Sequence, residues 1–256
     1  MQNLTVAVVQ QEIVPNNPQQ NLATFSRALK DLKNCDLIAL PEVFTTGFCA
    51  NARNFAEHVD GTAYGWMADH AKQLGAVITG SLVVKEGETY FNRMVWMRPD
   101  GTYTHYDKRH LFRMGGEHMR YQCGNERIIV ELKGWRILPL VCYDLRFPVW
   151  SRNRNDYDLS IYVANWPSAR ALHWNRLLQA RAIENQAYVV GVNRVGMDEV
   201  HQHYVGDSAI YGPAGEVIVH SQEPGSFYAE LYGDKLLEYR QKFPAHMDAD
   251  DFELRF

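Results

Sequence analysis

Short apolar runs with the length and alternation of β-strands recur along the whole chain. They predict strands over residues 4–10, 37–40, 76–84, 90–97, 102–106, 128–132, 137–142, 159–164, 188–192, 207–211, 216–220 and 227–231. The short segments 85–88, 98–101 and 212–215 contain glycine, in two cases with proline, as tight turns do. We expect the strands that flank each of these turns to pair antiparallel.

Between some of these strands, apolar residues recur at the 3.6-residue spacing of a helix. Residues 18–33 place Leu22, Phe25, Leu29 and Leu32 on one face. Similar patterns predict helices over residues 64–74 and 172–185, and a weaker one over 234–241. No linker rich in proline, glycine or serine divides the chain, so we expect one domain over residues 1–256. Two mostly buried sheets with helices on their outer faces would accommodate these elements, which makes the fold class α/β.

Two passages from a helix into a strand resemble one another. Residues 32–40 and 153–161 both combine a polar helix end, an aspartate and an apolar strand. The aspartates are Asp36 and Asp158. The similarity suggests two related halves, although it is too short to establish an internal duplication.

Composition excludes several classes of protein. The 256 residues include 26 Lys and Arg against 30 Asp and Glu, a net charge of −4, which disfavours an extended nucleic-acid surface or a polybasic membrane anchor. No apolar run approaches the roughly 20 residues of a membrane helix, and the first residues lack the basic start of a secretory signal. We therefore expect a cytoplasmic protein.

The four cysteines contain no Cys-x-x-Cys pair, and they are too few for a disulfide scaffold in a chain of this length. We expect free thiols. His201 and His203 lie close together, but no carboxylate or cysteine follows at zinc-binding spacing. A Gly-x-Ser-x-Gly elbow and glycine-rich phosphate loops are also missing. The sequence predicts neither a metal nor a cofactor.

One cysteine lies where a nucleophile would. The apolar strand 137–142 ends on Cys142, a charged turn follows, and a helix can begin at Pro148. Backbone N–H groups of such a turn are the donors that an oxyanion hole needs. Free cysteines are, however, often simply buried small side chains. The local pattern alone leaves both interpretations open.

Two other strand ends carry chemically useful groups. Glu42 follows the strand at 37–40, and Lys108 follows the strand at 102–106. Most glutamates and lysines are solvated surface charges. Sites in layered sheet folds nevertheless gather at strand ends, so Glu42, Lys108 and Cys142 could converge.

Three motifs surround these residues, Leu-Pro-Glu at 40–42, Tyr-Asp-Lys-Arg-His-Leu-Phe at 106–112 and Val-Cys-Tyr-Asp-Leu-Arg-Phe-Pro at 141–148. In this order, they resemble the three signatures of the nitrilase superfamily. Further similarity covers residues 173–185, 206–208 and 212–215, so the resemblance extends from residue 6 to about 232. Within the superfamily the chain is most similar to the ω-amidases, which hydrolyse 2-oxoglutaramate and related ω-amides.

The resemblance implies a four-layer αββα sandwich and a Glu-Lys-Cys triad. It carries over Glu42 as the general base, Lys108 as the cationic stabiliser and Cys142 as the nucleophile. A second family glutamate usually follows the lysine motif, and Glu117 fits that position better than Glu126. The resemblance also suggests a homodimer that pairs through helices near the nucleophile strand.

Substrate-binding residues are predicted around the triad. Arg146 could bind the free carboxylate of an ω-amide through two hydrogen bonds, or it could pair with Asp144 or Glu117 to hold the turn. We expect residues 45–48, with Phe48, and residues 165–167, with Trp166, to line the pocket. Trp166 could instead be an ordinary core residue, but its place at a strand end favours the rim of the site. The Tyr143 backbone N–H is the expected second donor to the oxyanion.

Three functions remain in competition. The first is a cysteine amidase that releases ammonia from small ω-amides such as 2-oxoglutaramate and 2-oxosuccinamate. The second is a nitrile or N-carbamoyl hydrolase, because the same triad attacks both groups. The third is a non-catalytic binding module that kept only the fold.

Overall fold

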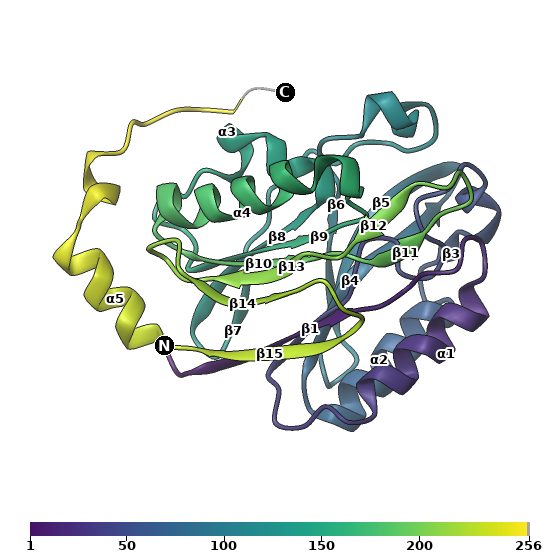
Figure 1. Ribbon diagram of the computed structural model, residues 1–256, viewed down its shortest axis with the longest axis horizontal. Coiled ribbons are helices and arrows are strands. Elements are labelled where there is room, and N and C mark those ends of the chain that lie inside the picture. Colours follow the sequence, from purple (N-terminus) through teal and green to yellow (C-terminus); the bar gives the residue numbers. More distant parts are fainter. Residues whose placement is uncertain (255–256) are drawn as a thin grey trace.

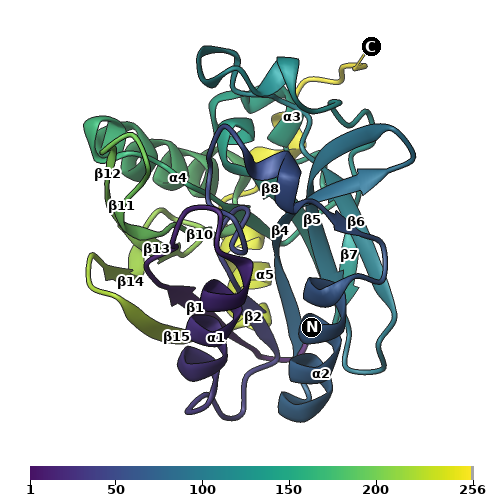
Figure 2. The ribbon, with the colours of Figure 1, turned by 90° about the vertical axis from the view of Figure 1, so that its right-hand side faces the viewer.

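The computed structural model describes residues 1–254 and shows an α/β fold with two mixed sheets (Figures 1 and 2). The strands of the first sheet lie in the order β15, β1, β2, β4, β5 and β6, with β3 beside β4. Their bounds are Gly225–Leu231 for β15, Leu4–Gln10 for β1, Leu37–Ala39 for β2, Glu57–His58 for β3, Val77–Glu86 for β4, Thr89–Met97 for β5 and Tyr103–Asp107 for β6.

The strands of the second sheet lie in the order β14, β13, β10, β9, β8 and β7. Their bounds are Val217–Ser221 for β14, Ser208–Tyr211 for β13, Tyr188–Val192 for β10, Leu159–Val163 for β9, Trp135–Val141 for β8 and Val130–Leu132 for β7. A separate hairpin joins β11 (Val195–Met197) to β12 (His203–Val205). All twelve predicted strands are confirmed, within a few residues at their ends.

Both sheets have a parallel centre and antiparallel margins. The strands β1, β2 and β4 run parallel, as do β8, β9 and β10. The three glycine-containing turns join β4 to β5, β5 to β6 and β13 to β14, and each pair is antiparallel as predicted. Because parallel strands point the same way, their carboxyl ends meet at one edge of each sheet.

Helices cover the outer face of each sheet, which gives the four layers α, β, β and α (Figure 1). The helices α1 (Pro18–Leu29) and α2 (Thr62–Leu74) pack on the first sheet, against β1 and β4. The helix α4 (Ala171–Asn185) packs on β10 of the second sheet. The short α3 (Pro148–Ser151) follows β8, and α5 (Gly233–Lys242) follows β15.

The first helix is shorter than the predicted 18–33. Asn17 caps its start by accepting a hydrogen bond from the Gln20 N–H at 3.1 Å. After Leu29 the chain tightens, and the Leu32 N–H donates to the Leu29 carbonyl. This turn keeps Leu32 buried without continuing the helix, which explains why the apolar spacing overestimated its length.

The apolar positions of the first sheet divide between two cores. In β1, Leu4, Val6 and Val8 face the cluster between the sheets, whereas Ala7 and Val9 face the cluster under α1 and α2. Such alternation is a property of strand geometry. Because both faces are covered, the central strands are apolar nearly throughout.

The two similar passages of the sequence occupy equivalent places in the two sheets. Asp36 precedes β2 and accepts from the Thr5 N–H of β1 at 2.8 Å. Asp158 precedes β9 and accepts from the Arg136 N–H of β8 at 3.1 Å. In both cases the backbone N–H of the aspartate also donates to the carbonyl of that same partner residue. The shared pattern therefore reflects a shared way of joining neighbouring parallel strands.

Three strands escaped the sequence pattern, namely β3, β11 and β12. Each has only two or three residues, so neither alternation nor an apolar run can develop.

None of the helices in residues 1–254 combines the length and the apolar character needed to cross a membrane.

Candidate active site

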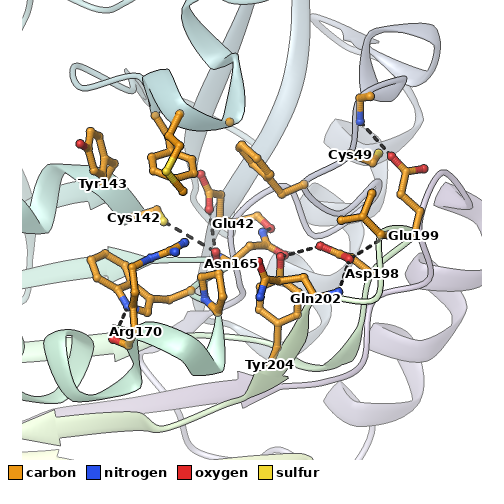
Figure 3. A pocket seen from close by; sticks show the side chains of 18 of the residues that line it. Glu42, Cys49, Cys142, Tyr143, Asn165, Arg170, Asp198, Glu199, Gln202 and Tyr204 are labelled. Carbon is orange, nitrogen blue, oxygen red and sulfur yellow. Dashed lines mark hydrogen bonds between the residues drawn. The ribbon is translucent and has the colours of Figure 1, made fainter.

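A cavity of about 320 Å³ opens where strand ends of both sheets meet (Figure 3). Glu42 follows β2, Lys108 follows β6, Cys142 follows β8 and Asn165 follows β9. All of the predicted site residues except Glu117 line this cavity, namely Glu42, Phe48, Lys108, Cys142, Tyr143, Arg146 and Trp166. The strand ends thus bring together groups that are far apart in the sequence.

Lys108 lies between Glu42 and Glu117 in a buried cluster that forms the floor of the cavity. Its Nζ donates to Glu42 Oε1 at 2.8 Å and to Glu117 Oε1 and Oε2 at 3.0 and 2.9 Å. All three side chains are almost completely buried. Burial alone lowers the pKa of the Lys108 ammonium, but the Glu117 and Glu42 carboxylates outweigh burial and raise this pKa well above its usual value. The two carboxylates therefore favour the charged, ammonium form of Lys108.

Asn92 joins the two glutamates and was not predicted. This residue of β5 is 1% exposed, and its Nδ2 donates to Glu42 Oε1 at 2.8 Å and to Glu117 Oε1 at 3.1 Å. The sequence did contain a signal, because asparagine is disfavoured inside strands. A buried polar residue in the apolar strand 90–97 indicates a partner across the core.

Glu42 has one free acceptor position in this arrangement. Its Oε1 accepts from both Lys108 and Asn92, whereas Oε2 accepts from the Asn165 N–H at 2.8 Å. The Asn165 side chain also donates to the Glu42 carbonyl at 2.6 Å. The Glu42 side chain interacts with the Cys142 thiol. Since Oε1 already has two donors, Oε2 is the oxygen available to take a proton from Cys142.

Cys142 begins the tight turn Cys142–Arg146 directly after β8. Its φ of +45° lies in the left-handed region, which non-glycine residues rarely adopt. Its sulfur lies 4.0 Å from the Asn165 carbonyl oxygen (Figure 3). Burial raises the pKa of the Cys142 thiol well above its usual value, Glu42 adds to the rise, and Lys108 opposes it. Burial and Glu42 therefore favour the thiol form of Cys142, and Lys108 alone does not outweigh them.

Glu117 lies behind Lys108 rather than on the cavity surface. Its Oε2 also accepts from the Phe112 N–H at 2.6 Å, so its two oxygens together accept four hydrogen bonds. No acceptor position is left for a proton. Glu126, the other candidate, lines a different cavity. Glu117 can therefore hold Lys108 in place but is badly placed to act as a base.

Aromatic rings form one wall of the cavity. The rings of Phe48 and Phe112 are 6.3 Å apart, and those of Phe112 and Tyr143 are 5.1 Å apart. Of the predicted residues 45–48 only Phe48 lines the cavity, whereas all of 165–167 do. The wall can accept the apolar part of a small substrate.

Two arginines, Arg146 and Arg170, bring positive charge to the cavity. The alternative prediction that Arg146 pairs with Asp144 or Glu117 is wrong, because other donors occupy both carboxylates. Arg146 instead contacts His173 Nδ1 at 3.1 Å and lies over the Trp166 ring. Arg170 lies over the Phe112 ring. Within residues 1–254 neither arginine forms an ion pair, so both can bind an anion.

The turn of the β11–β12 hairpin completes the rim and was not predicted. The Tyr204 hydroxyl donates to Asp198 Oδ2 at 2.9 Å, which closes the turn (Figure 3). Glu199 accepts from the Ala50 N–H at 3.0 Å and from Asn16 Nδ2 at 3.2 Å. A polar loop carries no sequence signal that separates it from any other loop.

All four cysteines are free thiols. In residues 1–254, no three His, Cys, Asp or Glu side chains gather closely enough to hold a metal ion. A thiol, a carboxylate and a buried ammonium line the cavity together, on Cys142, Glu42 and Lys108.

Comparisons with known proteins match one family over most of the chain. A family model described as carbon-nitrogen hydrolase matches residues 5–236. Omega-amidase YafV of Escherichia coli (strain K12) is 51% identical, over 99% of this chain and 100% of that protein. The 2-oxoglutaramate amidase of Bacillus subtilis (strain 168) is 32% identical, over 95% and 96%.

Solved structures show the same fold. XC1258 from Xanthomonas campestris, a CN-hydrolase superfamily protein with an arsenic adduct in its active site, has a TM-score of 0.98 at 45% identity over 100% of both chains. Saccharomyces cerevisiae Nit3, a member of branch 10 of the nitrilase superfamily, has a TM-score of 0.84 at 23% identity over 95% of both. The second likeness concerns the fold alone.

Proposed function

Because the chain belongs to the carbon–nitrogen hydrolase family, we propose that it is an ω-amidase, which hydrolyses the terminal amide of small dicarboxylic acid monoamides. The observation that carries the proposal is that Glu42 interacts with both Cys142 and Lys108 on the floor of a cavity. Two arginines that form no ion pair within residues 1–254 stand on its wall. The similarity to an omega-amidase over nearly the whole chain supports it. The substrates would be 2-oxoglutaramate and 2-oxosuccinamate.

The reaction begins with proton transfer. Glu42 Oε2 takes the proton of the Cys142 thiol, and the sulfur attacks the amide carbon, since a thiolate is the stronger nucleophile. Because the pKa of the thiol is raised, the proton needs an acceptor close by, and Glu42 is that acceptor. The carbonyl oxygen becomes an oxyanion, for which the Lys108 ammonium and the Tyr143 N–H are the proposed partners.

Collapse of this intermediate breaks the carbon–nitrogen bond. Glu42 returns its proton to the departing nitrogen, so ammonia leaves and a thioester on Cys142 remains. Glu42 then takes a proton from water, and the hydroxyl attacks the thioester carbon. A second oxyanion collapses, the carbon–sulfur bond breaks, and the proton on Glu42 restores the Cys142 thiol. The products are the dicarboxylic acid and ammonia.

The walls suit an anionic amide. Arg146 and Arg170 are cations without an acidic partner in residues 1–254, while Phe48 and Tyr143 offer apolar surface. A guanidinium binds a carboxylate through two parallel hydrogen bonds. The free carboxylate of the substrate would bind Arg146, with its methylene groups against the aromatic wall.

Mass spectrometry of the intact protein provides the direct test. After brief incubation with 2-oxoglutaramate we expect an acyl adduct on Cys142 together with release of ammonia. Cys142→Ala should show neither. The matched control is Cys49→Ala, because Cys49 lines the same cavity but contacts no catalytic group; it should keep the adduct.

Comparison of substrate classes decides between the functions. A preference for nitriles or N-carbamoyl compounds over ω-amides would contradict the amidase proposal while keeping the same triad. Absence of any adduct from all three classes, with the fold intact, would favour a non-catalytic binding module.

We also infer that residues 1–256 act as one domain in a cytoplasmic homodimer. The free state of all four thiols suits a reducing compartment. Leu172, Val149 and Ile183 are 66%, 56% and 50% exposed on or beside α4, next to the nucleophile turn. Such exposed apolar side chains favour burial against a second copy. Sedimentation should show a dimer that Leu172→Asp weakens.

A further inference from the structure

A single buried carboxylate connects the segment that carries Lys108 to the turn that carries Cys142. It belongs to Asp144, which is 0% exposed and lies two residues after Cys142. Its side chain accepts four hydrogen bonds, two on each oxygen. The catalytic steps above give this carboxylate no part.

Asp144 is bound by one residue on each side of Lys108, Tyr106 before it and His110 after it. The Tyr106 hydroxyl donates to Oδ2 at 2.8 Å, and the His110 N–H donates to Oδ1 at 3.0 Å. His110 Nδ1 lies 2.7 Å from Oδ1, so it is a donor in the tautomer that this contact requires. The backbone that presents Lys108 is therefore held before and after the lysine.

The fourth bond closes the turn around the nucleophile. The Val141 N–H donates to Asp144 Oδ2 at 3.0 Å, and Cys142 lies inside the loop that this bond forms. A left-handed backbone at a non-glycine residue costs on the order of 1–3 kcal/mol and persists only where surrounding contacts impose it. The bond from Val141 to Asp144 is such a contact for Cys142.

These bonds join the two sheets at the site. Tyr106 belongs to β6 of the first sheet, whereas Val141 ends β8 of the second. The His110 ring also stacks on Phe147, at 3.8 Å between centroids and 6° between planes, which adds an apolar contact between the same two segments. Asp144 thereby sets the lysine segment against the nucleophile turn.

We propose that Asp144 is a positioning residue that sets the place of the Cys142 sulfur relative to the Lys108 ammonium. Loss of the Asp144 carboxylate then slows the chemical step and leaves substrate binding nearly unchanged. The inference rests on the proposed role of Cys142 as the nucleophile.

Asparagine cannot replace Asp144 in this arrangement. Each carboxylate oxygen accepts one backbone N–H, that of His110 on Oδ1 and that of Val141 on Oδ2. A hydroxyl or an imidazole can exchange donor for acceptor, but a backbone N–H cannot. Whichever way the amide is turned, its NH₂ group faces one of these two N–H groups.

The test compares Asp144→Asn with Asp207→Asn. Asp207 is a matched control because it is 2% exposed, accepts from His220 Nε2 at 2.9 Å, and does not line the cavity. The measurements are kcat and KM, and the rate at which iodoacetamide alkylates Cys142 as a function of pH. Alkylation needs no amide substrate, so it still tests Asp144 if the proposed substrate class fails.

For Asp144→Asn we expect kcat to fall about 100-fold, as for a misplacement of about 1 Å, with KM within three-fold. The midpoint of alkylation should shift by about one pH unit, because the displaced sulfur feels the Lys108 and Glu42 charges, which set the pKa of the thiol, differently. Asp207→Asn should change kcat and KM less than two-fold. It should shift the midpoint of alkylation by less than half a pH unit (about 0.7 kcal/mol).

A lower melting temperature with unchanged kcat and alkylation in Asp144→Asn would overturn the proposal, because Asp144 would then only stabilise the fold. If Asp144→Asn does not fold, Tyr106→Phe decides. This variant removes one of the four donors, and we expect a three- to ten-fold lower kcat at constant KM. An unchanged kcat in folded Tyr106→Phe would equally overturn it.

Discussion

The floor and the rim of the cavity differ in the burial and in the pairing of their charged side chains. On the floor, Glu42, Lys108 and Glu117 are buried, and ammonium, amide and backbone N–H groups occupy nearly every carboxylate acceptor position. At the rim, Arg146 and Arg170 are partly exposed and unpaired within residues 1–254. The difference supports the proposal that the floor performs the bond chemistry and the rim selects the substrate.

The burial of the floor also makes its charges interdependent. Two carboxylates surround one ammonium at hydrogen-bond distance, and the thiol next to them has a raised pKa. A buried charge that loses its partner is costly. Changes on the floor should therefore have large effects on both rate and stability, whereas changes at the rim should mainly alter affinity.

The largest effect is expected for Glu42→Gln. The loss of the base should lower kcat by about 10²- to 10⁴-fold. Because the Glu42 carboxylate contributes to the raised pKa of the Cys142 thiol, the same change should lower this pKa and speed alkylation near pH 7. Parallel measurement of turnover and alkylation checks both. A parallel loss of the two would contradict the role of Glu42 as a base.

The second largest effect is expected for Lys108→Met. Loss of one donor to the oxyanion costs about 3–4 kcal/mol in activation free energy in acyl-transfer enzymes. It also leaves Glu42 and Glu117 facing each other without a cation, and breaking a buried ion pair costs about 3–5 kcal/mol of unfolding free energy. Urea unfolding and steady-state kinetics measure the two effects. An unchanged free energy of unfolding would show that water reaches Glu42 and Glu117 more readily than their burial indicates.

Arg146→Gln should affect binding more than chemistry. A charge-assisted hydrogen bond contributes about 1.5–3 kcal/mol, so KM for 2-oxoglutaramate should rise about 10- to 100-fold while kcat stays within a few-fold. An ω-amide without a free carboxylate serves as the control, because its KM should not change. If both substrates respond alike, Arg146 supports the turn instead.

The smallest effect is expected for Glu199→Ala. This change removes the two contacts that tie the β11–β12 turn to Ala50 and Asn16. Exposed hydrogen bonds contribute about 0.5–1.5 kcal/mol, so KM should rise two- to ten-fold with the melting temperature nearly unchanged. A large fall in kcat would show that the turn also orders the floor.

Prediction from the sequence succeeded where a local pattern carried the information. The strand ends that present Glu42, Lys108 and Cys142 followed from apolar runs that stop at a charged or reactive residue, and the three motifs distinguished these residues from ordinary surface charges. The fold class followed for the same reason, because strand alternation and turn composition are properties of neighbouring residues. The predicted length of α1 was wrong because helical spacing does not show where the helix ends and a tighter turn begins.

What the sequence determined by itself was therefore the set of reactive groups and the order of the strands that carry them. The tertiary structure alone decided that Asn92 bridges two glutamates, that Asp144 binds both sides of Lys108, and that Arg146 pairs with neither Asp144 nor Glu117. Each of these contacts joins different strand ends or competes with other donors for one carboxylate. Such competition depends on distances in three dimensions, which periodicity along the chain does not encode.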